Sequence, residues 1–227
     1  MEQVRLFIGS DKREAVGLHV FLESLFSKTS IPVNLTVLTD SIVRTDGTNA
    51  FSKSRFLIPY LCNYQGFAIF LDGADMLLRH DLAYLWDLRE DCFAVQVVKT
   101  NYLTKNPRKY IGTPLEADNL DYPRKNWSSV VIWNCGYEGH RELTPESLNS
   151  ASGSYLHRFS WVPDERIGDL PKEWNHLVGE SDPSPEAKLV HYTLGIPGFA
   201  HYRHDEHSAE WTNHLKAAAT GLQYLGK

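Results

Sequence analysis

The chain opens with a short apolar run, a stretch of helical periodicity and a second apolar run. The first run covers residues 4–10 (VRLFIGS), and the second, rich in β-branched residues, covers residues 33–39. Between them, apolar side chains recur at positions 18, 21, 22 and 25, the spacing of one helix face. Asp11, with Glu14 three positions later, is typical of a capping box. The order predicts a β-α-β unit with a right-handed crossover and parallel strands.

Further apolar runs continue this alternation. Strands are predicted at residues 67–71, 92–98, 129–135 and 188–193, and helices at residues 51–62, 80–88 and 208–225. Pro59 is expected to kink or limit the helix of residues 51–62. The apolar side of the last helix consists of Trp211, Leu215, Ala218 and Leu222. Since no repeat, low-complexity run or linker divides the chain, we expect a single α/β domain with a mostly parallel sheet flanked by helices.

Composition and charge exclude some functions. The 227 residues are 42% hydrophobic and 22% charged, with a net charge of -5, so a basic face for nucleic acid is not expected. No apolar segment reaches the roughly 20 residues that span a bilayer. The first residues are expected to form a strand and no signal peptide. Cys62, Cys92 and Cys135 form no CxxC pair, which favours reduced thiols and a cytoplasmic location.

A long interval without strong periodicity separates two predicted strands. Residues 99–128 contain three prolines and several basic residues, together with Tyr110, Tyr122 and Trp127. Loops of this length in a compact domain are commonly functional or mobile. Aromatic faces stack on bases and sugar rings, and basic groups attract phosphate. We therefore expect a lid or an acceptor-binding loop; the alternative is a solvated loop held by a few aromatic side chains.

Two carboxylates follow the apolar run of residues 67–71. Asp72 ends the predicted strand and Asp75 comes three positions later, with Gly73 between them. On a straight strand these side chains would diverge, but glycine permits a turn that returns Asp75 beside Asp72. Carboxylates at the carboxyl end of a strand can hold Mn²⁺ or Mg²⁺. The alternative is that Asp72 caps the turn and Asp75 is solvated or caps the next helix.

Histidines supply the remaining candidate metal ligands. His191 ends the short apolar strand in LVHYTLG and could be a third ligand, or a hydrogen-bonded structural residue. His201, His204 and His207 recur every three residues, but the acidic residues among them favour a solvated segment.

The motifs IFLDGADMLL, VIWNCGY, LPKEWNHL and LVHYTLG, in this order, resemble family 8 glycosyltransferases of the GT-A fold. FIGSDKREAV, RFLIPYL and YPRKNWSS are similar to small bacterial and phage glycosyltransferase-like proteins. The resemblance covers about residues 4–199. It implies a Rossmann-type GT-A domain with a nucleotide-binding half (about 1–98), an acceptor and sugar half (about 99–200) and a C-terminal helix (207–225).

The resemblance also implies a chemistry. The donor would be a nucleotide sugar, usually a UDP-sugar, with Mn²⁺ or Mg²⁺ bridging its phosphates, and the acceptor is unspecified. The implied activity is that of a hexosyltransferase that retains anomeric configuration. Asp72 and Asp75 match the DxD position, His191 the late metal-binding histidine, and Arg55 the arginine that reaches the donor.

Other residues match positions around the donor. Asn134 and Gly136 match the Asn-x-Gly segment beside the sugar, and Asn134 is assigned a catalytic role. Asp164 and Glu165 match the acidic or amide pair near the reacting carbon. The nucleotide contacts are assigned to Ile8, Gly9, Ser10 and Gly195.

Two departures from the family pattern weaken this match. The acids are separated by two residues where the family has one. The loop after His191 reads IPGF and lacks the lysine that would contact the diphosphate, a role that Lys125, Arg124 or Arg203 could fill. Two alternatives remain: a non-catalytic nucleotide-sugar-binding module on the same fold, and a nucleotidyltransferase. The single glycine of GSDKREA argues against the latter.

Overall fold

The computed structural model describes residues 3–39 and 51–220. Its helices and strands follow one another along the chain, with η marking a 3₁₀ helix. The strands are β1 (Val4–Gly9), β2 (Val33–Leu38), β3 (Phe67–Leu71), β4 (Met76–Leu78), β5 (Val95–Val97), β6 (Arg108–Lys109), β7 (Ala117–Asp118), β8 (Val130–Asn134), β9 (Ile167–Asp169), β10 (His176–Leu177) and β11 (Leu189–His191).

The described residues also form six α-helices and seven 3₁₀ helices. They are α1 (Ala15–Lys28), α2 (Ile58–Leu61), α3 (Leu82–Trp86), α4 (Pro145–Ser150), α5 (Gly153–His157) and α6 (Ser208–Thr220). The 3₁₀ helices are η1 (Lys12–Glu14), η2 (Ser54–Leu57), η3 (Trp127–Ser129), η4 (Glu138–Glu142), η5 (Asp164–Arg166), η6 (Lys172–Asn175) and η7 (Ala200–Tyr202).

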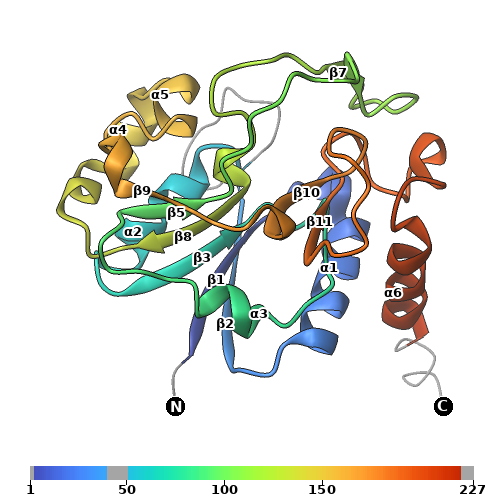
Figure 1. Ribbon diagram of the computed structural model, residues 1–227, viewed down its shortest axis with the longest axis horizontal. Helices are drawn as coiled ribbons and strands as arrows, with labels where there is room; N and C mark the ends of the chain where they lie inside the picture. Colours follow the sequence, from blue (N-terminus) through green and yellow to red (C-terminus); the bar gives the residue numbers. More distant parts are fainter. Residues whose placement is uncertain (1–2, 40–50, 221–227) are drawn as a thin grey trace.

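A six-stranded sheet in the order β2-β1-β3-β8-β5-β9 forms the centre of the molecule (Figure 1). β1 pairs in parallel with β2 and with β3, and β5 pairs in parallel with β9. Only β8 runs against its neighbours in this sheet. The expected α/β architecture with a mostly parallel sheet is therefore confirmed.

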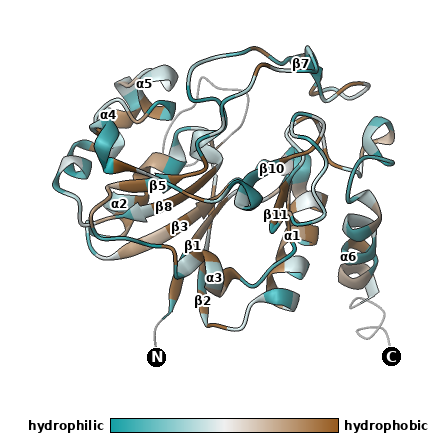
Figure 2. Ribbon diagram, in the orientation of Figure 1, coloured by the Kyte–Doolittle hydropathy of each residue, from teal (hydrophilic) through white to brown (hydrophobic). Residues whose placement is uncertain are grey.

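Helices cover both faces of the sheet because its strands are apolar on both sides. Phe7, Phe70 and Trp133 point into one core, which α2, α4 and α5 close. Neighbouring strand residues such as Ile69 and Ile132 point into a second core, which α1 and α3 close. The alternation follows from the two-residue period of a strand. In Figure 2 the central strands are accordingly brown along most of their length.

A second, three-stranded sheet in the order β10-β11-β4 lies beside α1 (Figure 1). β11 runs antiparallel to β4, which follows the DGAD turn directly. A third apolar cluster lies between this sheet, α1 and α6, and Trp211 of α6 is fully buried in it. This small sheet connects the late part of the chain to the end of β3.

One sequence-based element boundary needs correction. Residues 51–62 form η2 followed by the one-turn helix α2, since Pro59 lies at the N-terminus of α2 and cannot donate a helical hydrogen bond. The C-terminal helix is described from Ser208 to Thr220, and the rest of the predicted helix, with Leu222, lies outside the described residues.

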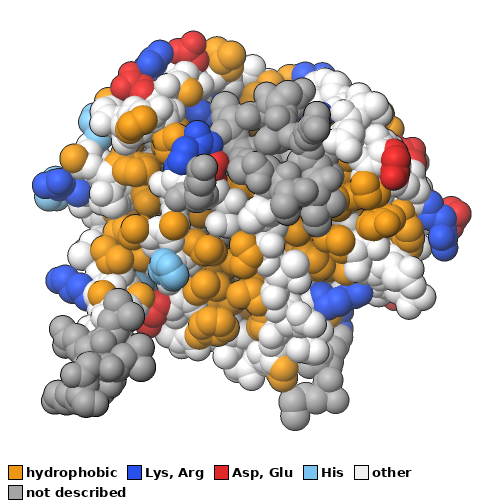
Figure 3. All heavy atoms as spheres, turned by 180° about the vertical axis from the view of Figure 1, so that it is seen from behind, with side chains coloured by type: hydrophobic (Ala, Val, Ile, Leu, Met, Phe, Trp, Pro, Cys, Tyr) orange, Lys and Arg blue, Asp and Glu red, His pale blue; other side chains and the backbone are white. Residues whose placement is uncertain are grey.

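The molecular surface is largely ordinary for a globular domain. Figure 3 shows hydrophobic side chains gathered across the middle of the face opposite to that of Figure 1. Large apolar side chains such as Phe26 and Leu103 remain exposed. Of the helices that the structure describes, none has the length and apolar character that crossing a bilayer requires.

Candidate active site

The DGAD turn begins where β3 ends. The Asp72 N–H donates to the Ser129 carbonyl (3.0 Å), and the Met76 N–H donates to the Gly73 carbonyl (3.0 Å), which starts β4 at once. Gly73 has a φ of 80°. A Cβ there would lie 3.0 Å from both the Ile8 Cβ and the Gly9 carbonyl oxygen. Glycine is therefore needed on two counts, backbone conformation and close contact with β1.

The turn brings Asp75 next to β11 and so next to His191. His191 is opposite Met76 in the small sheet, and the Tyr192 N–H donates to the Asp75 carbonyl (2.8 Å). The His191 Nε2 lies 3.3 Å from Asp75 Oδ2 and 3.8 Å from Asp72 Oδ2. The structure thus brings together the three residues for which the sequence suggested a metal site.

Asn175 fixes the orientation of the His191 ring. His191 Nδ1 lies 2.8 Å from the Asn175 Oδ1, an acceptor, so Nδ1 carries the proton in this contact. The Nε2 atom is left facing the two carboxylates. An outer-shell partner on the second nitrogen is the usual arrangement for a metal-binding histidine.

Arg55 holds Asp72 from the other side. Its Nη1 lies 2.7 Å from Asp72 Oδ1 and donates to the Ser128 carbonyl (2.7 Å). Its guanidinium also lies 4.7 Å from the centre of the Phe70 ring. Arg55 is buried, so the pair is shielded from water. Burial raises the pKa of Asp72; Arg55 opposes this rise, and the neighbouring Asp75 adds to it.

A divalent cation fits this donor set. Asp75 Oδ1 is buried and has no hydrogen-bond partner among the described residues, although its neighbour Oδ2 faces His191. An unpaired buried carboxylate oxygen is costly, and a cation would remove that cost. Two carboxylates and an imidazole are ligands that Mn²⁺ accepts.

A cavity of about 150 Å³ lies over these side chains. Ser128, Ser129 and His157 form part of its wall, while Lys109, Tyr110 and Tyr122 come from the long segment 99–128. Burial lowers the pKa of His157 to about 3, and Arg55 contributes to this shift, so its ring is neutral. His157 accepts and donates within the wall, 2.7 Å from the Ser128 hydroxyl and 3.1 Å from that of Ser52.

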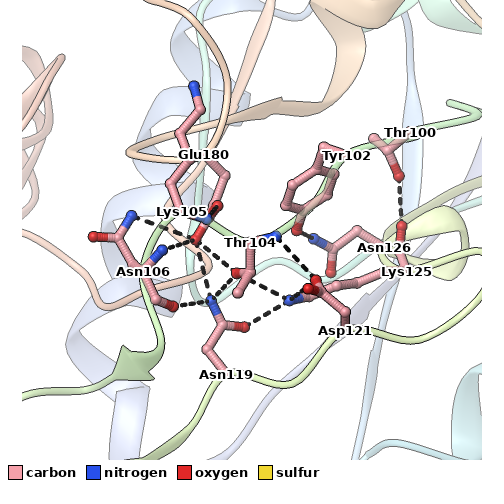
Figure 4. Close-up of polar contacts among 10 residues, drawn as sticks. All are labelled: Thr100, Tyr102, Thr104, Lys105, Asn106, Asn119, Asp121, Lys125, Asn126 and Glu180. Atoms are coloured by element: carbon pink, nitrogen blue, oxygen red, sulfur yellow. Dashed lines mark hydrogen bonds and ion pairs between the residues drawn. The ribbon is translucent and has the colours of Figure 1, made fainter.

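The segment 99–128 is fastened above the cavity by a buried polar network (Figure 4). Glu180, from the loop after β10, accepts from the Lys105 N–H (2.7 Å), the Thr104 hydroxyl (3.0 Å) and the Asn119 amide (3.1 Å). Lys125 donates to Asn119 Oδ1 (2.8 Å). One carboxylate therefore joins both arms of the segment to the rest of the fold.

Glu14 is a further carboxylate near Asp75. It precedes α1 and makes no side-chain cap, and its Oε1 is buried without a hydrogen-bond partner. Burial, and next the negative charge of Asp75, raise the pKa of Glu14 to about 8. The capping box expected from Asp11 and Glu14 is thus half wrong: Asp11 caps η1, but Glu14 is turned into the interior.

Comparison with known proteins places the chain in a family. No protein-family model matches it. The Arabidopsis thaliana protein CDI is 39% identical to it over 227 residues, which cover 93% of this chain and 86% of that protein. The chain belongs to the CDI family.

Solved structures with the fold of this CDI-family chain are GT-A glycosyltransferases. The bifunctional glycosyltransferase WbbM has a TM-score of 0.68 at 16% identity, over 94% of this chain and 49% of WbbM. The galactosyltransferase LgtC, solved with donor and acceptor sugar analogs, has a TM-score of 0.57 at 11% identity, over 94% of this chain and 96% of LgtC. GlyE of Streptococcus pneumoniae has a TM-score of 0.62 at 12% identity, over 94% of this chain and 61% of GlyE. The chain thus spans about half of WbbM, and the likeness shows a shared fold.

In this CDI-family chain, β1 ends at the edge of the sheet where the DGAD turn lies. Ile8 is opposite Leu71, so Gly9 and Ser10 lie beside the DGAD turn. A Cβ on Gly9 would lie 2.1 Å from the Phe51 ring, which covers it. Gly195 has a φ of 149° in the loop after His191, where a Cβ would lie 2.3 Å from the Tyr202 ring. The four predicted nucleotide contacts, Ile8, Gly9, Ser10 and Gly195, border the site but are not among the residues that line the cavity.

Asn134 and Gly136 are not brought to the cavity. Because β8 is antiparallel to β3, Asn134 is opposite Phe67, at the end of β3 far from Asp72. Four residue steps along β3 separate Phe67 from Leu71, which places Asn134 about 13 Å from the end of the strand that precedes Asp72. Its amide instead donates to the carbonyls of Asp91 and Phe93 (3.2 Å each). The roles assigned to Asn134 and Gly136 therefore find no support in their positions.

Asp164 and Glu165 are also absent from the cavity wall. The Asp164 side chain is 80% exposed and lies 2.6 Å from Arg124 Nη2. Both acids belong to η5, which precedes β9. The resemblance to family 8 glycosyltransferases implied a place near the reacting carbon, but both side chains are exposed.

Several cavity residues escaped the sequence analysis. Asn126, Ser128 and Ser129 come from η3 and its N-cap, directly before β8, and Lys109 comes from the long segment. Because β8 is antiparallel to β3, the start of β8 lies beside Asp72 and its end lies away from it. No local sequence pattern reveals that direction. Lys125 and Arg124, expected as substitutes for the missing lysine, are engaged with Asn119 and Asp164. Lys109 is the lysine that lines the cavity, together with Arg55.

Proposed function

We propose that this chain is a metal-dependent glycosyltransferase of the hexosyltransferase type. Its donor would be a nucleotide sugar, with a UDP-sugar the first choice, and its acceptor is open. The observation that carries the proposal is the convergence of Asp72, Asp75 and His191 at the carboxyl edge of a GT-A sheet. Membership of family 8, retention of configuration and a cytoplasmic location remain predictions from the sequence.

The roles of the residues follow from their positions. Asp72, Asp75 and His191 Nε2 would hold Mn²⁺ or Mg²⁺, and when bound this cation neutralises charge on the departing diphosphate. Arg55 keeps Asp72 in place through the 2.7 Å ion pair. Lys109 adds a positive charge to the same cavity, although burial lowers its pKa. Lys109 would thereby replace the lysine that the IPGF loop lacks.

The long segment would act as a lid. Ligand pockets commonly measure about 300–1,000 Å³, whereas this cavity measures about 150 Å³. A nucleotide sugar therefore requires the segment carrying Lys109, Tyr110 and Tyr122 to move outward. Closure over the donor would then exclude water from the reacting carbon.

Donor hydrolysis tests the proposal. The protein is incubated with a panel of nucleotide sugars and Mn²⁺, and release of the nucleoside diphosphate is measured. We expect release with at least one donor and a reduction of about 100-fold in Asp75→Ala. Asp87→Ala, whose parent side chain is 77% exposed, is the control and should leave the rate unchanged. If Asp75→Ala releases diphosphate at the wild-type rate, the metal assignment is wrong.

A non-catalytic nucleotide-sugar-binding module is the second candidate. The positions of Asn134, Asp164 and Glu165 outside the cavity favour it, because no predicted catalytic group faces the site. Thermal stability and diphosphate release, measured together, distinguish the two candidates. A module would gain thermal stability with a donor and Mn²⁺ but release no diphosphate.

A further inference from the structure

A second cluster of possible metal ligands lies where the small sheet meets the C-terminal helix. It consists of His176 at the start of β10 and of Glu206 and His207, immediately before α6. One ligand atom of each lies within 4.8 Å of the other two. The sequence favoured a solvated segment for His201, His204 and His207, whereas the structure places His207 beside His176 and Glu206.

The Glu206 carboxylate stands between the two imidazoles. Its Oε2 lies 2.9 Å from His176 Nε2, and its Oε1 lies 3.0 Å from His207 Nε2. The two rings are nearly perpendicular, at 85°, with their centres 5.9 Å apart. The His176 side chain is only 5% exposed, so this nitrogen is directed at the carboxylate inside the protein.

The Ser184 carbonyl offers a fourth possible ligand. Its carbonyl lies 3.2 Å from His207 Nε2, and its N–H donates to Glu206 Oε1 (2.8 Å). His207 itself has a φ of 60°, a conformation that a non-glycine residue adopts only at a cost. The surrounding structure therefore holds the His207 ring toward His176 and Glu206 at the expense of backbone strain.

We propose that His176, Glu206 and His207 form a zinc site, with the Ser184 carbonyl or a water molecule as the fourth ligand. Two imidazole nitrogens and a carboxylate oxygen are typical zinc ligands, and four ligands complete a tetrahedral shell. The neutral imidazole is the form of histidine that binds metal. The carboxylate supplies the negative charge that the site requires.

Zinc here would brace the neighbouring candidate active site. Asn175, which holds the His191 ring, directly precedes His176, and Leu177 is opposite His191 in the small sheet. A metal that ties β10 to the start of α6 would keep this strand in register. The site is separate in ligands from the one at Asp72 and Asp75.

Zinc binding by the whole chain tests the inference. All measurements use the Asp75→Ala background, so that the other site does not contribute. Calorimetry with zinc should give one equivalent, and Co²⁺ should give the visible absorption of a tetrahedral site. His207→Asn, in which asparagine tolerates positive φ, should weaken zinc binding by about 100-fold or more and abolish the Co²⁺ spectrum. Thermal stability should rise with zinc only where binding persists.

His204→Asn is the matched control, because His204 is an exposed histidine of the same segment. It should bind zinc as tightly as the background protein. Glu206→Gln is the second ligand variant, and circular dichroism establishes that each variant is folded. The inference is overturned if the background protein takes up no zinc, or if His204→Asn and His207→Asn bind it equally well.

Discussion

At the scale of single residues, the candidate site depends on a glycine and on buried carboxylates. Gly73 alone permits the turn that returns Asp75 to His191, because its φ is positive and β1 lies against it. Asp72, Asp75 and Glu14 are all buried, yet Asp72 alone has a cationic partner at 2.7 Å. The site therefore stores unfavourable electrostatic energy that a cation would release.

Replacing Gly73 with alanine should destabilise the protein and the site. Positive φ costs of order 1–3 kcal/mol, and the added Cβ would press on Ile8 and Gly9. Gly112→Ala separates these causes, since Gly112 has a φ of 75° with nothing within 4 Å of its Cβ position. In urea unfolding we expect Gly73→Ala to cost more than Gly112→Ala. Equal costs would mean that contact with β1 is unimportant.

Glu14 should make stability fall as the pH rises. Its pKa is about 8 in the folded state and 4.5 normally, so the folded protein binds the extra proton. This group therefore costs nothing below about pH 4.5, reduces stability as the pH rises toward 8, and has a constant effect above that. At pH 7 without metal, Glu14→Gln should raise the free energy of unfolding by about 2–3 kcal/mol.

The matched variant for this pH series is Glu138→Gln, whose parent side chain is 85% exposed. It should reproduce the wild-type dependence of melting temperature on pH between 5 and 8. If Glu14→Gln also reproduces it, the raised pKa of Glu14 is refuted.

At the scale of elements, the long segment 99–128 is the part least determined by its own sequence. Its only strands are the two-residue pair β6 and β7. It is held in place by Glu180, from a loop more than 50 residues later in the chain. A buried carboxylate is stable only while its hydrogen-bond donors remain. We therefore expect these hydrogen bonds to form and break together, as a single cooperative network or latch.

Glu180→Gln should loosen this segment without unfolding the sheet. The amide can accept fewer hydrogen bonds from Lys105, Thr104 and Asn119, and it cannot balance the charge of Lys125. Limited trypsin digestion should therefore cut within residues 105–125 several times faster. The exposed Glu186→Gln, from the same region, should be cut at the wild-type rate. Unchanged cleavage of Glu180→Gln would show that the latch does not hold the segment.

At the scale of the whole molecule, the two sheets bring distant parts of the chain to one cavity. Residues from η2, the DGAD turn, the segment 99–128, α5 and β11 all line it. The small sheet matters most, because β4 follows the turn and pairs with the strand that carries His191. The arrangement lets a ligand between them link the early and late parts of the fold.

Binding of a donor should change the whole segment above the cavity. Since a cavity of about 150 Å³ must open for entry and then close, a nucleotide sugar with Mn²⁺ should slow trypsin cleavage of residues 105–125. Mn²⁺ alone and the donor with Asp75→Ala provide the comparisons. Identical cleavage with and without both ligands would count against a lid.

The sequence by itself determined the alternating strands and helices, the α/β class and the turn at Gly73. These features depend on the local period of apolar residues and on the conformational freedom of glycine, both readable within a few positions. Asp72, Asp75 and His191 were found for this reason, since each follows or ends an apolar strand.

Only the tertiary structure decided which strand ends share an edge. The antiparallel direction of β8 moves Asn134 away from Asp72 and brings Ser128 and Ser129 in. The burial of Glu14, the entry of Lys109 and the meeting of His176 with Glu206 likewise depend on packing between segments far apart in the chain. Local patterns fix what a segment becomes, whereas long-range pairing fixes what its side chains face.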